Sequence, residues 1–358
     1  MSWFAGRALV SWLLLCLSAV FCQAMAEEAK TGESEVIETP EVFISATKTE
    51  TPIKQVTSAV EIITGEQMQQ RKIKTVMEAL RLAQGLAVFQ SGGPGTLAQV
   101  RMRGGTPEQT LVLIDGAIVN SATDGTYNFA NLTTDNIDRI EILRGSQGMM
   151  WGSDAMGGVI NITTKRGRET PNISSFIEYG SFATLREGAS VIGKKGPVDM
   201  AATLSRWDTS NFSAINYRRG AAERDGFHNW QGSVKLGVDL PKDGRLEFNF
   251  RWMDGITNLD GTAFNPGTLG FDPADVLGAK THSNQHVYTG SYLQPITNWW
   301  SQRLTLARAT ESFTTSSGTV ERNLVTGAEA PPFPLSSEIN TTSNRLEWQH
   351  DVQIVKPL

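Results

Sequence analysis

Apolar and polar residues alternate with a period of two along the second half of the chain, most clearly in a hairpin near residue 240. Its apolar positions are Trp230, Val234, Leu236, Val238 and Leu240, followed by Leu246, Phe248, Phe250 and Trp252. The positions between them are polar: Gln231, Ser233, Lys235, Asp239, Arg245, Glu247, Asn249 and Arg251. PKDG (Pro241–Gly244) lies between the two runs as a turn. This period predicts β-strands with one apolar and one polar face.

The connections between such strands distinguish two architectures. Similar strands are expected at 198–205 and 345–354, and a period of two alone also fits a soluble sandwich whose core is the apolar face. However, short connections (GKKGP, PKDG and QPITN) alternate with long ones near 208–227, 255–284 and 312–343. Outer-membrane barrels have this alternation, and tryptophans near strand ends suit an interfacial girdle. The pattern favours a transmembrane barrel over residues 171–358.

The first half of the chain mixes helix and strand signals. TGEQ (Thr64–Gln67) and TVME (Thr75–Glu78) have capping-box spacing, and the second box opens a helix that we expect to end at Gly85. The expected strands are AVEII (59–63), LAVFQ (86–90), QVRMR (99–103), TLVLIDG (110–116), RIEILRG (139–145) and GGVINITTK (157–165). A glycine loop, SGGPGT (91–96), lies between two of them. These signals predict a compact α+β domain over residues 53–168.

The N-terminus has the features of a secretory signal peptide over residues 1–26. Arg7 precedes an apolar stretch from Ala8 to Phe21, and Ala24 to Ala26 form a small-x-small cleavage site. A membrane anchor is the alternative, but the stretch is short for a spanning helix. Lipid attachment at Cys22 is disfavoured because Phe21 stands where a small residue is needed. Cleavage would remove both cysteines of the chain, which excludes disulfides and thiolate metal sites.

Residues 27–52 are rich in Glu, Thr, Lys, Ser and Pro, and we expect a mobile tail because they cannot bury enough apolar surface to offset the entropy of ordering. One short β-prone run interrupts the tail, EVFISA (41–46), flanked by Pro40 and Pro52. The net charge of −5 is spread without long runs of one sign. This disfavours a nucleic-acid partner.

Three sequence stretches carry a resemblance to a known family. LVLIDGAIVN (111–120) and IDRIEILRGSQGMMWGSDAMGGVINITTK (137–165) resemble the plug domain of TonB-dependent outer-membrane receptors. SGGPGTLAQVRMRG (91–104) is most similar to the cobalamin-receptor branch. Two departures concern local packing: Ser146 stands where the family usually has proline, and Met149, Met150 and Trp151 replace a smaller apolar and tyrosine pattern.

The resemblance implies an α+β plug followed by an antiparallel transmembrane β-barrel in the outer membrane of a Gram-negative bacterium, as a monomer. About eight strands follow Pro171, against about 22 in family barrels, and an eight-stranded barrel is too narrow to hold a plug. The chain is therefore not expected to be the complete transporter, but a fragment, the product of a truncated gene or an incomplete sequence. The implied partners are outer-membrane lipid, the periplasmic protein TonB and a scarce ligand. Cobalamin or a related corrinoid is the first ligand, and a ferric siderophore is the alternative.

The run EVFISA occupies the place of the TonB box, with the plug tail facing the periplasm. Its residues are Glu41, Val42, Phe43, Ile44, Ser45 and Ala46. An extended β-prone segment on a tether can add to the sheet edge of a partner through main-chain hydrogen bonds. The alternative is that this run forms an ordinary first strand of the plug.

Candidate ligand contacts lie in two plug loops, 90–96 and 120–127. The candidates are Gln90, Ser91, Gly92, Gly93, Asn120, Ser121, Asp124 and Tyr127. Cobalamin receptors hold calcium with aspartates of surface loops, and the candidates here are Asp208, Asp225, Asp254 and Asp260, with Asp272 and Asp275 nearby. These aspartates lack the spacing of a calcium loop, so solvated side chains are the alternative. No other cofactor is expected.

Four further interpretations are weaker, and we do not expect an enzyme. Ser45 to Lys48 match the SxxK of penicillin-recognising hydrolases, but KTG at Lys30 to Gly32 precedes it, whereas that family has KTG after it. The glycine-rich run 145–158 lacks the GKS or GKT ending of a phosphate loop. His282 and His286 could bind a metal, but no HExxH is present. A signalling receptor would carry an additional folded domain before the TonB box.

Overall fold

The computed structural model describes residues 58–212, 224–259, 279–316 and 336–352, together with Lys48. It also gives the backbone of six short strands at 43–44, 51–52, 261–265, 270–277, 320–323 and 329–330. The predicted signal peptide and most of the predicted tail lie outside the described residues.

The plug region contains two sheets. The five-stranded sheet has the order β3-β8-β9-β6-β7, with β6 and β9 parallel and the other neighbours antiparallel. Its strands are β3 (Ala59–Thr64), β6 (Thr110–Ile114), β7 (Ala117–Ile118), β8 (Ile137–Arg144) and β9 (Gly158–Thr164). A separate hairpin pairs β4 (Leu86–Gln90) with β5 (Ala98–Met102). All six predicted plug strands are confirmed.

Both predicted capping boxes are confirmed. Thr64 caps α2 (Gly65–Gln70) and Thr75 caps α3 (Val76–Leu82), each side-chain hydroxyl accepting from the backbone N–H three residues on. The expected end of the second helix is wrong: α3 ends at Leu82, and its C-cap residue Ala83 is already extended, so Gly85 is not at the C′ position. Gly85, with φ +72°, lies in the turn that leads into β4.

Short helical turns complete the plug. They are η2 (Pro107–Gln109), η3 (Phe129–Asn131), α4 (Gly148–Trp151) and η4 (Ser153–Ala155). The five residues of β6 are all buried, but in two clusters. Val112 and Ile114 lie in the core that includes the helices, whereas Leu111 and Leu113 lie in a second, smaller cluster. Val76 and Leu80 of α3 are fully buried. No helix in the described part of the chain has the length and apolarity needed to cross a membrane.

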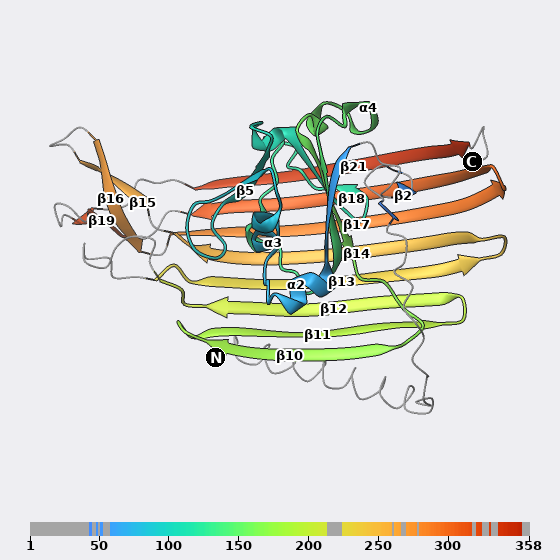
Figure 1. Ribbon diagram of the computed structural model, residues 1–358. Coiled ribbons are helices and arrows are strands. Elements are labelled where there is room, and N and C mark those ends of the chain that lie inside the picture. Colours follow the sequence, from blue (N-terminus) through green and yellow to red (C-terminus); the bar gives the residue numbers. More distant parts are fainter. Residues whose placement is uncertain are drawn as a thin grey trace. The chain divides into compact units, whose positions relative to one another are not determined.

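The second region is an eight-stranded antiparallel sheet with the order β10-β11-β12-β13-β14-β17-β18-β21 (Figure 1). Its strands are β10 (Asn172–Gly180), β11 (Thr184–Lys195), β12 (Val198–Thr209), β13 (Phe227–Leu240), β14 (Gly244–Asn258), β17 (Lys280–Thr297), β18 (Trp300–Ser316) and β21 (Ser337–Val352). The predicted count of eight strands is confirmed. The alternation of short and long connections is confirmed from β11 onward.

Two long connections are not simple loops, and this part of the prediction is wrong. They contain β15 (Gly261–Asn265), β16 (Gly270–Leu277), β19 (Val320–Asn323) and β20 (Glu329–Ala330), which form a four-stranded sheet. The pairing of β16 with β19 joins two connections far apart in sequence. Backbone pairing of this kind leaves no alternating side-chain pattern in a short segment, so periodicity misses it.

The polar face of the eight-stranded sheet lies toward the plug. Lys235 and Arg251, from alternate positions of β13 and β14, are buried and bond to plug residues. The intervening positions of each strand, such as Leu236 of β13 and Phe248 of β14, are exposed on the opposite face. A soluble sandwich would bury the apolar face in its core. The sheet therefore has the inverted arrangement of a membrane barrel wall, with a polar interior and an apolar exterior.

Candidate functional site

The first candidate loop, 90–96, is closed on itself by one backbone carbonyl. Gly93 O accepts hydrogen bonds from the Gln90 side-chain amide (2.9 Å), the Thr96 hydroxyl (2.8 Å) and the Thr96 backbone N–H (3.3 Å). Ser91 N–H donates to Leu97 O at 3.0 Å, which joins the two ends of the loop. The side-chain amide of Gln90 thus stabilises the loop, whereas Ser91 and Gly92 are exposed.

Two glycines of this loop let it lie directly against the wall. A Cβ at Gly93 would overlap the Asn211 amide, and a Cβ at Gly95 would overlap the Thr257 hydroxyl and the Phe227 ring. Gly95 also has φ +82°, a conformation that other residues rarely adopt. The glycines are therefore required for close approach, and the loop lies at the end of β12, β13 and β14 where the long connections begin.

The second candidate loop, 120–127, is built around Asn120. Its side-chain oxygen accepts from Val112 N–H at 2.7 Å, and its amide donates to Thr110 O at 3.0 Å and Gly125 O at 2.8 Å. Ser121 N–H donates to Thr126 O at 2.7 Å. Asp124 lies exposed at the tip of this loop.

Tyr127 lies below that tip and is buried. Its ring meets Phe129 edge-on at 4.8 Å, and its hydroxyl donates to Gln285 of β17 at 3.4 Å. Burial raises the pKa of Tyr127 above its ordinary value. Both loops thus reach the same end of the eight-stranded sheet, with Ser91, Gly92 and Asp124 presented outward and Gln90, Asn120 and Tyr127 holding the loops.

The candidate calcium ligands do not gather in the structure. Asp208 accepts from Arg206 and lies 3.0 Å from His228 Nδ1, and Asp254 is paired with His282. Asp225 is buried elsewhere, and Asp260 lies outside the described residues. Within the described ranges, no three carboxylate, imidazole or thiol groups lie close enough to hold a metal ion. A calcium site stays a prediction, and a histidine metal site gains no support.

The tail shows one difference from the expectation of an unpaired segment. Phe43–Ile44 (β1) pairs with Thr51–Pro52 (β2) as a two-stranded antiparallel sheet, separate from the plug sheet. Glu41, Val42, Ser45 and Ala46 lie outside the described residues. Phe43 and Ile44 therefore pair within the tail and not with the plug sheet. The assignment of residues 41–46 as the TonB box stays a prediction.

Lys48 fixes the bend between the two short strands. Its ammonium is 2.7 Å from Glu347 Oε1 and 4.8 Å from the centre of the Trp151 ring. Its carbonyl accepts from the Gln349 amide at 3.3 Å. An ammonium engaged in this way is not a free catalytic base, so the SxxK interpretation of Ser45 to Lys48 gains no support.

The plug is anchored to the wall by ion pairs that sequence reasoning did not identify. Lys235 Nζ lies 2.8 Å from Asp115 Oδ1 and 3.6 Å from Glu247 Oε1. Asp115 also accepts from the Thr164 backbone N–H at 3.0 Å and from its hydroxyl at 2.7 Å. Burial alone would raise the pKa of the Asp115 carboxyl, but the charge of Lys235 and these hydrogen bonds outweigh it and hold the pKa below its ordinary value.

Further contacts join the same elements. Arg186 of β11 bridges Asp135 of the plug (3.2 Å) and Glu178 of β10 (3.1 Å). Arg251 is fully enclosed, and its guanidinium donates to Asn136 Oδ1 at 2.9 Å and Gln231 Oε1 at 2.6 Å. These contacts involve plug residues 115–165, so they hold the C-terminal part of the plug against the wall.

One local signal pointed to this anchor. Asp115 (φ +47°) and Gly116 (φ +83°) form a two-residue turn between β6 and β7, which matches the Asp-Gly preference of a type I′ hairpin. The turn places the carboxylate beside β9 and the wall. Nothing local indicates Lys235 as the partner, because the two residues are 120 positions apart.

Comparison with known proteins identifies the architecture. Residues 52–159 match the model of the TonB-dependent Receptor Plug Domain. The chain belongs to the TonB-dependent receptor family. It is 35% identical over 255 residues to the vitamin B12 transporter BtuB of Vibrio vulnificus (strain CMCP6), covering 68% of this chain and 38% of that protein. It is 30% identical over 221 residues to BtuB of Photobacterium profundum, covering 61% and 36%.

Solved receptors share the fold. The pyoverdine outer membrane receptor FpvA of Pseudomonas aeruginosa PAO1 matches with a TM-score of 0.70 at 16% identity, over 87% of this chain and 46% of that chain. The ferric-catecholate import receptor Fiu of E. coli K12, in its open form, matches with a TM-score of 0.64 at 15% identity, over 87% and 49%. The chain therefore spans less than half the length of these relatives and structures.

Proposed function

We propose that this protein is an outer-membrane receptor that imports cobalamin or a related corrinoid, driven by TonB. The observation that supports cobalamin is the 35% identity over 255 residues to a vitamin B12 transporter, an aligned length greater than that of the plug domain. The likeness to siderophore receptors is 15–16% in identity and extends to the fold alone. The family consists of transport receptors and not of enzymes.

In this proposal the ligand binds where the two plug loops meet the long connections of the wall. Ser91, Gly92 and Asp124 are exposed there, and the glycine loop lies against Phe227 and Thr257. A preformed, self-bonded loop places contact groups with little loss of entropy on binding. Gln90, Gly93, Asn120, Ser121 and Tyr127 then support the site by fixing the loops.

TonB coupling in this proposal uses the run 41–46. Phe43 and Ile44 form a strand with Thr51 and Pro52, so their pairing capacity is used within the tail. A partner strand would replace this two-residue pairing with a longer one, which main-chain hydrogen bonds favour. A force that TonB exerts on the tail would reach β3 first, since β3 follows the tail in the chain and pairs only with β8 in the plug sheet.

A ferric siderophore is the second candidate, and the observation in its favour is the fold likeness to receptors for pyoverdine and ferric catecholates. Both ligand classes are scarce and bulky. The two ligand classes differ in charge and in the groups that would contact the plug loops, so the affinity of the receptor for each class distinguishes them.

Equilibrium binding tests the ligand. We expect the purified full-length receptor in detergent to bind cobalamin at least tenfold more tightly than ferric pyoverdine or a ferric catecholate. Asp124→Ala should weaken cobalamin binding, whereas Asp243→Ala, at an exposed turn on the opposite end of the wall, should not. Tighter binding of a ferric siderophore than of cobalamin would replace the first candidate by the second.

A further inference from the structure

The apolar face of the wall carries a groove of about 610 Å³ centred on Gly290. One row of partnered residues crosses four strands there, Phe248, Gly290, Leu306 and Leu346. A Cβ at Gly290 would meet no atom within 4 Å, so the missing side chain leaves a slot between Phe248 and Leu306. Leu306 and Leu346 are 55% and 70% exposed, which makes the floor and one side of the slot apolar.

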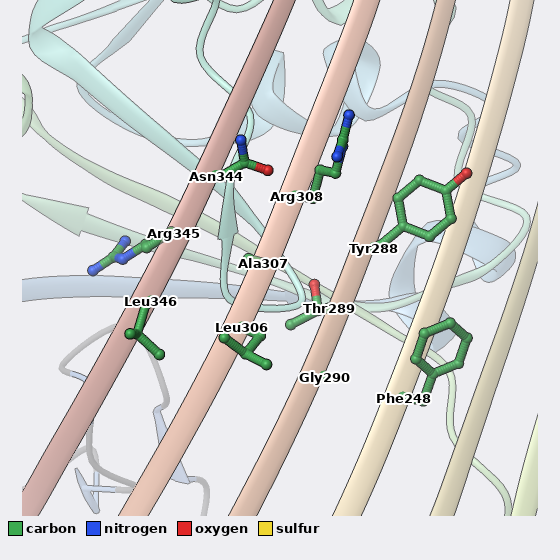
Figure 2. Close-up of a pocket in the computed structure, with 10 residues that line it drawn as sticks. All are labelled: Phe248, Tyr288, Thr289, Gly290, Leu306, Ala307, Arg308, Asn344, Arg345 and Leu346. Atoms are coloured by element: carbon green, nitrogen blue, oxygen red, sulfur yellow. The ribbon is translucent and has the colours of Figure 1, made fainter.

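The next row closes one end of the groove with polar groups. Figure 2 shows Tyr288, Arg308 and Asn344 along one end of the groove and the apolar row below them. The three residues are register partners on β17, β18 and β21. The groove is therefore amphipathic along the strand direction, with an apolar slot leading to a guanidinium, an amide and a phenol.

Arg308 is exposed on this face, and among the described residues no carboxylate lies within ion-pair distance of it. Arg206, the other arginine on this face of the described strands, has Asp208 and Glu187 as partners and lies over Trp230. An arginine directed at lipid is costly unless its head reaches the interface or meets an anion. We therefore expect the Arg308 guanidinium to bind an anionic group from outside the chain.

The position of Arg308 along its strand indicates where that anion lies. Trp300, on the same face, begins β18, and Arg308 is eight residues further on. At roughly 3.3 Å per residue and a tilt of about 40°, this places Arg308 roughly 20 Å from the level of Trp300, near the far edge of an apolar band of about 25 Å. Lipid headgroups of the leaflet on the side of the long connections begin at this level.

We propose that this groove binds one lipid of the outer leaflet, with an acyl chain in the slot at Gly290 and a phosphate-bearing headgroup on Arg308. Asn344 and Tyr288 add hydrogen-bond donors beside the guanidinium. Charge-assisted hydrogen bonds from arginine to phosphate select an anionic headgroup, and the empty side-chain position selects a chain. This inference rests on the proposed function only in placing the wall in the outer membrane.

Native mass spectrometry of the full-length protein, released from detergent after incubation with defined lipids, tests the proposal. The probes are phosphatidylglycerol and a galactosyl diacylglycerol with the same acyl chains but no phosphate. We expect the wild-type protein to retain one phosphatidylglycerol with at least tenfold preference. Arg308→Gln should lower this retention about tenfold, to the level of the galactolipid, and Arg308→Lys should retain part of it.

Matched variants separate charge and shape. Lys280→Gln removes an exposed charge from the same face at a distance and should change nothing. Gly290→Leu fills the slot and should reduce retention of both lipids, whereas Ala202→Leu adds the same bulk elsewhere on the face and should not.

Several results would overturn the lipid site. These are unchanged phosphatidylglycerol retention in Arg308→Gln, equal retention of both lipids by the wild type, displacement of the lipid by inorganic phosphate, or a dimer that Gly290→Leu abolishes. If the protein fails to enter membranes, the proposed function is wrong. If it enters membranes and imports its ligand but retains no lipid, only this inference is wrong.

Discussion

Lys235 of the wall reaches across to Asp115 in the β6–β7 turn, with 2.8 Å between the ammonium and the carboxylate. Each side chain is only 6% exposed, so the pair is shielded from solvent. Glu247 and Thr164 supply the remaining partners on the two sides. This pair holds the C-terminal part of the plug against the wall, and the first two predictions concern it.

Removal of the cation should loosen the plug. Lys235→Met leaves the Asp115 carboxylate buried without its counter-charge, which costs about 3–5 kcal/mol. We expect hydrogen exchange in β6, β7 and β9 to rise, measured by mass spectrometry in detergent. Lys242→Met, in the exposed turn of the same wall hairpin, should leave exchange unchanged. The double variant Asp115→Asn/Lys235→Met should recover part of the loss, and no change in Lys235→Met would contradict an anchoring role.

Acid should release the same anchor. The folded-state pKa of Asp115 lies below its ordinary value, so its contribution to stability is full above about pH 4 and is lost as the pH falls through the folded pKa. The wild type should therefore be more stable than Asp115→Asn at pH 7, and the difference should shrink between about pH 4 and pH 2. Thermal unfolding of both proteins across this range checks the sign. A difference that grows on acidification would refute the assignment.

The glycine loop should tolerate no side chain at Gly95. Its φ of +82° costs other residues about 1–2 kcal/mol, and a Cβ would also overlap Thr257 and Phe227. Gly104 has a similar φ of +76°, but open space surrounds it. We expect Gly95→Ala to weaken cobalamin binding at least tenfold, and Gly104→Ala to affect stability by the backbone cost alone. Equal ligand affinity in the two variants would show that the loop does not shape the site.

Variants of Tyr127 distinguish a residue that supports the loop from one that contacts the ligand. Because the ring is buried against Phe129, Tyr127→Ala should lower the stability of the plug by about 3–5 kcal/mol. Tyr127→Phe loses only the hydrogen bond to Gln285 and should cost about 1 kcal/mol, with little effect on ligand binding. Chemical denaturation and equilibrium dialysis measure the two effects. Loss of binding in Tyr127→Phe at unchanged stability would make Tyr127 a ligand contact.

The elements that the sequence predicts correctly are those fixed by near neighbours. The capping boxes at Thr64 and Thr75 depend on residues three positions away, and the strands of the wall depend on a period of two. The polar face at Lys235 and Arg251 was visible in the same alternation. The alternation does not indicate which plug residue each polar side chain of the wall contacts.

Long-range features escaped prediction for this reason. Asp115 and Lys235 meet only through the tertiary arrangement of the plug and the wall, and β16 pairs with β19 across a gap that no local rule spans. The candidate loops were located by resemblance, but their inner and outer residues differ only by packing. Tyr127 and Asp124 are three positions apart, and one is buried while the other is exposed. Periodicity does not distinguish them in a loop.

The central claim is TonB-driven import of cobalamin, and uptake by cells tests it most directly. Radiolabelled cobalamin is offered to a bacterium without its own cobalamin receptor that expresses the full-length protein, its Ile44→Pro variant or, as the control, Val36→Pro. We expect cells with the wild type or Val36→Pro to take up cobalamin. Uptake should be lost in cells with Ile44→Pro and in cells treated with a proton uncoupler. The Ile44→Pro variant should still bind cobalamin with an affinity within twofold of the wild type. Cobalamin uptake that persists with both Ile44→Pro and the uncoupler, or no cobalamin uptake by the wild type, would contradict the account.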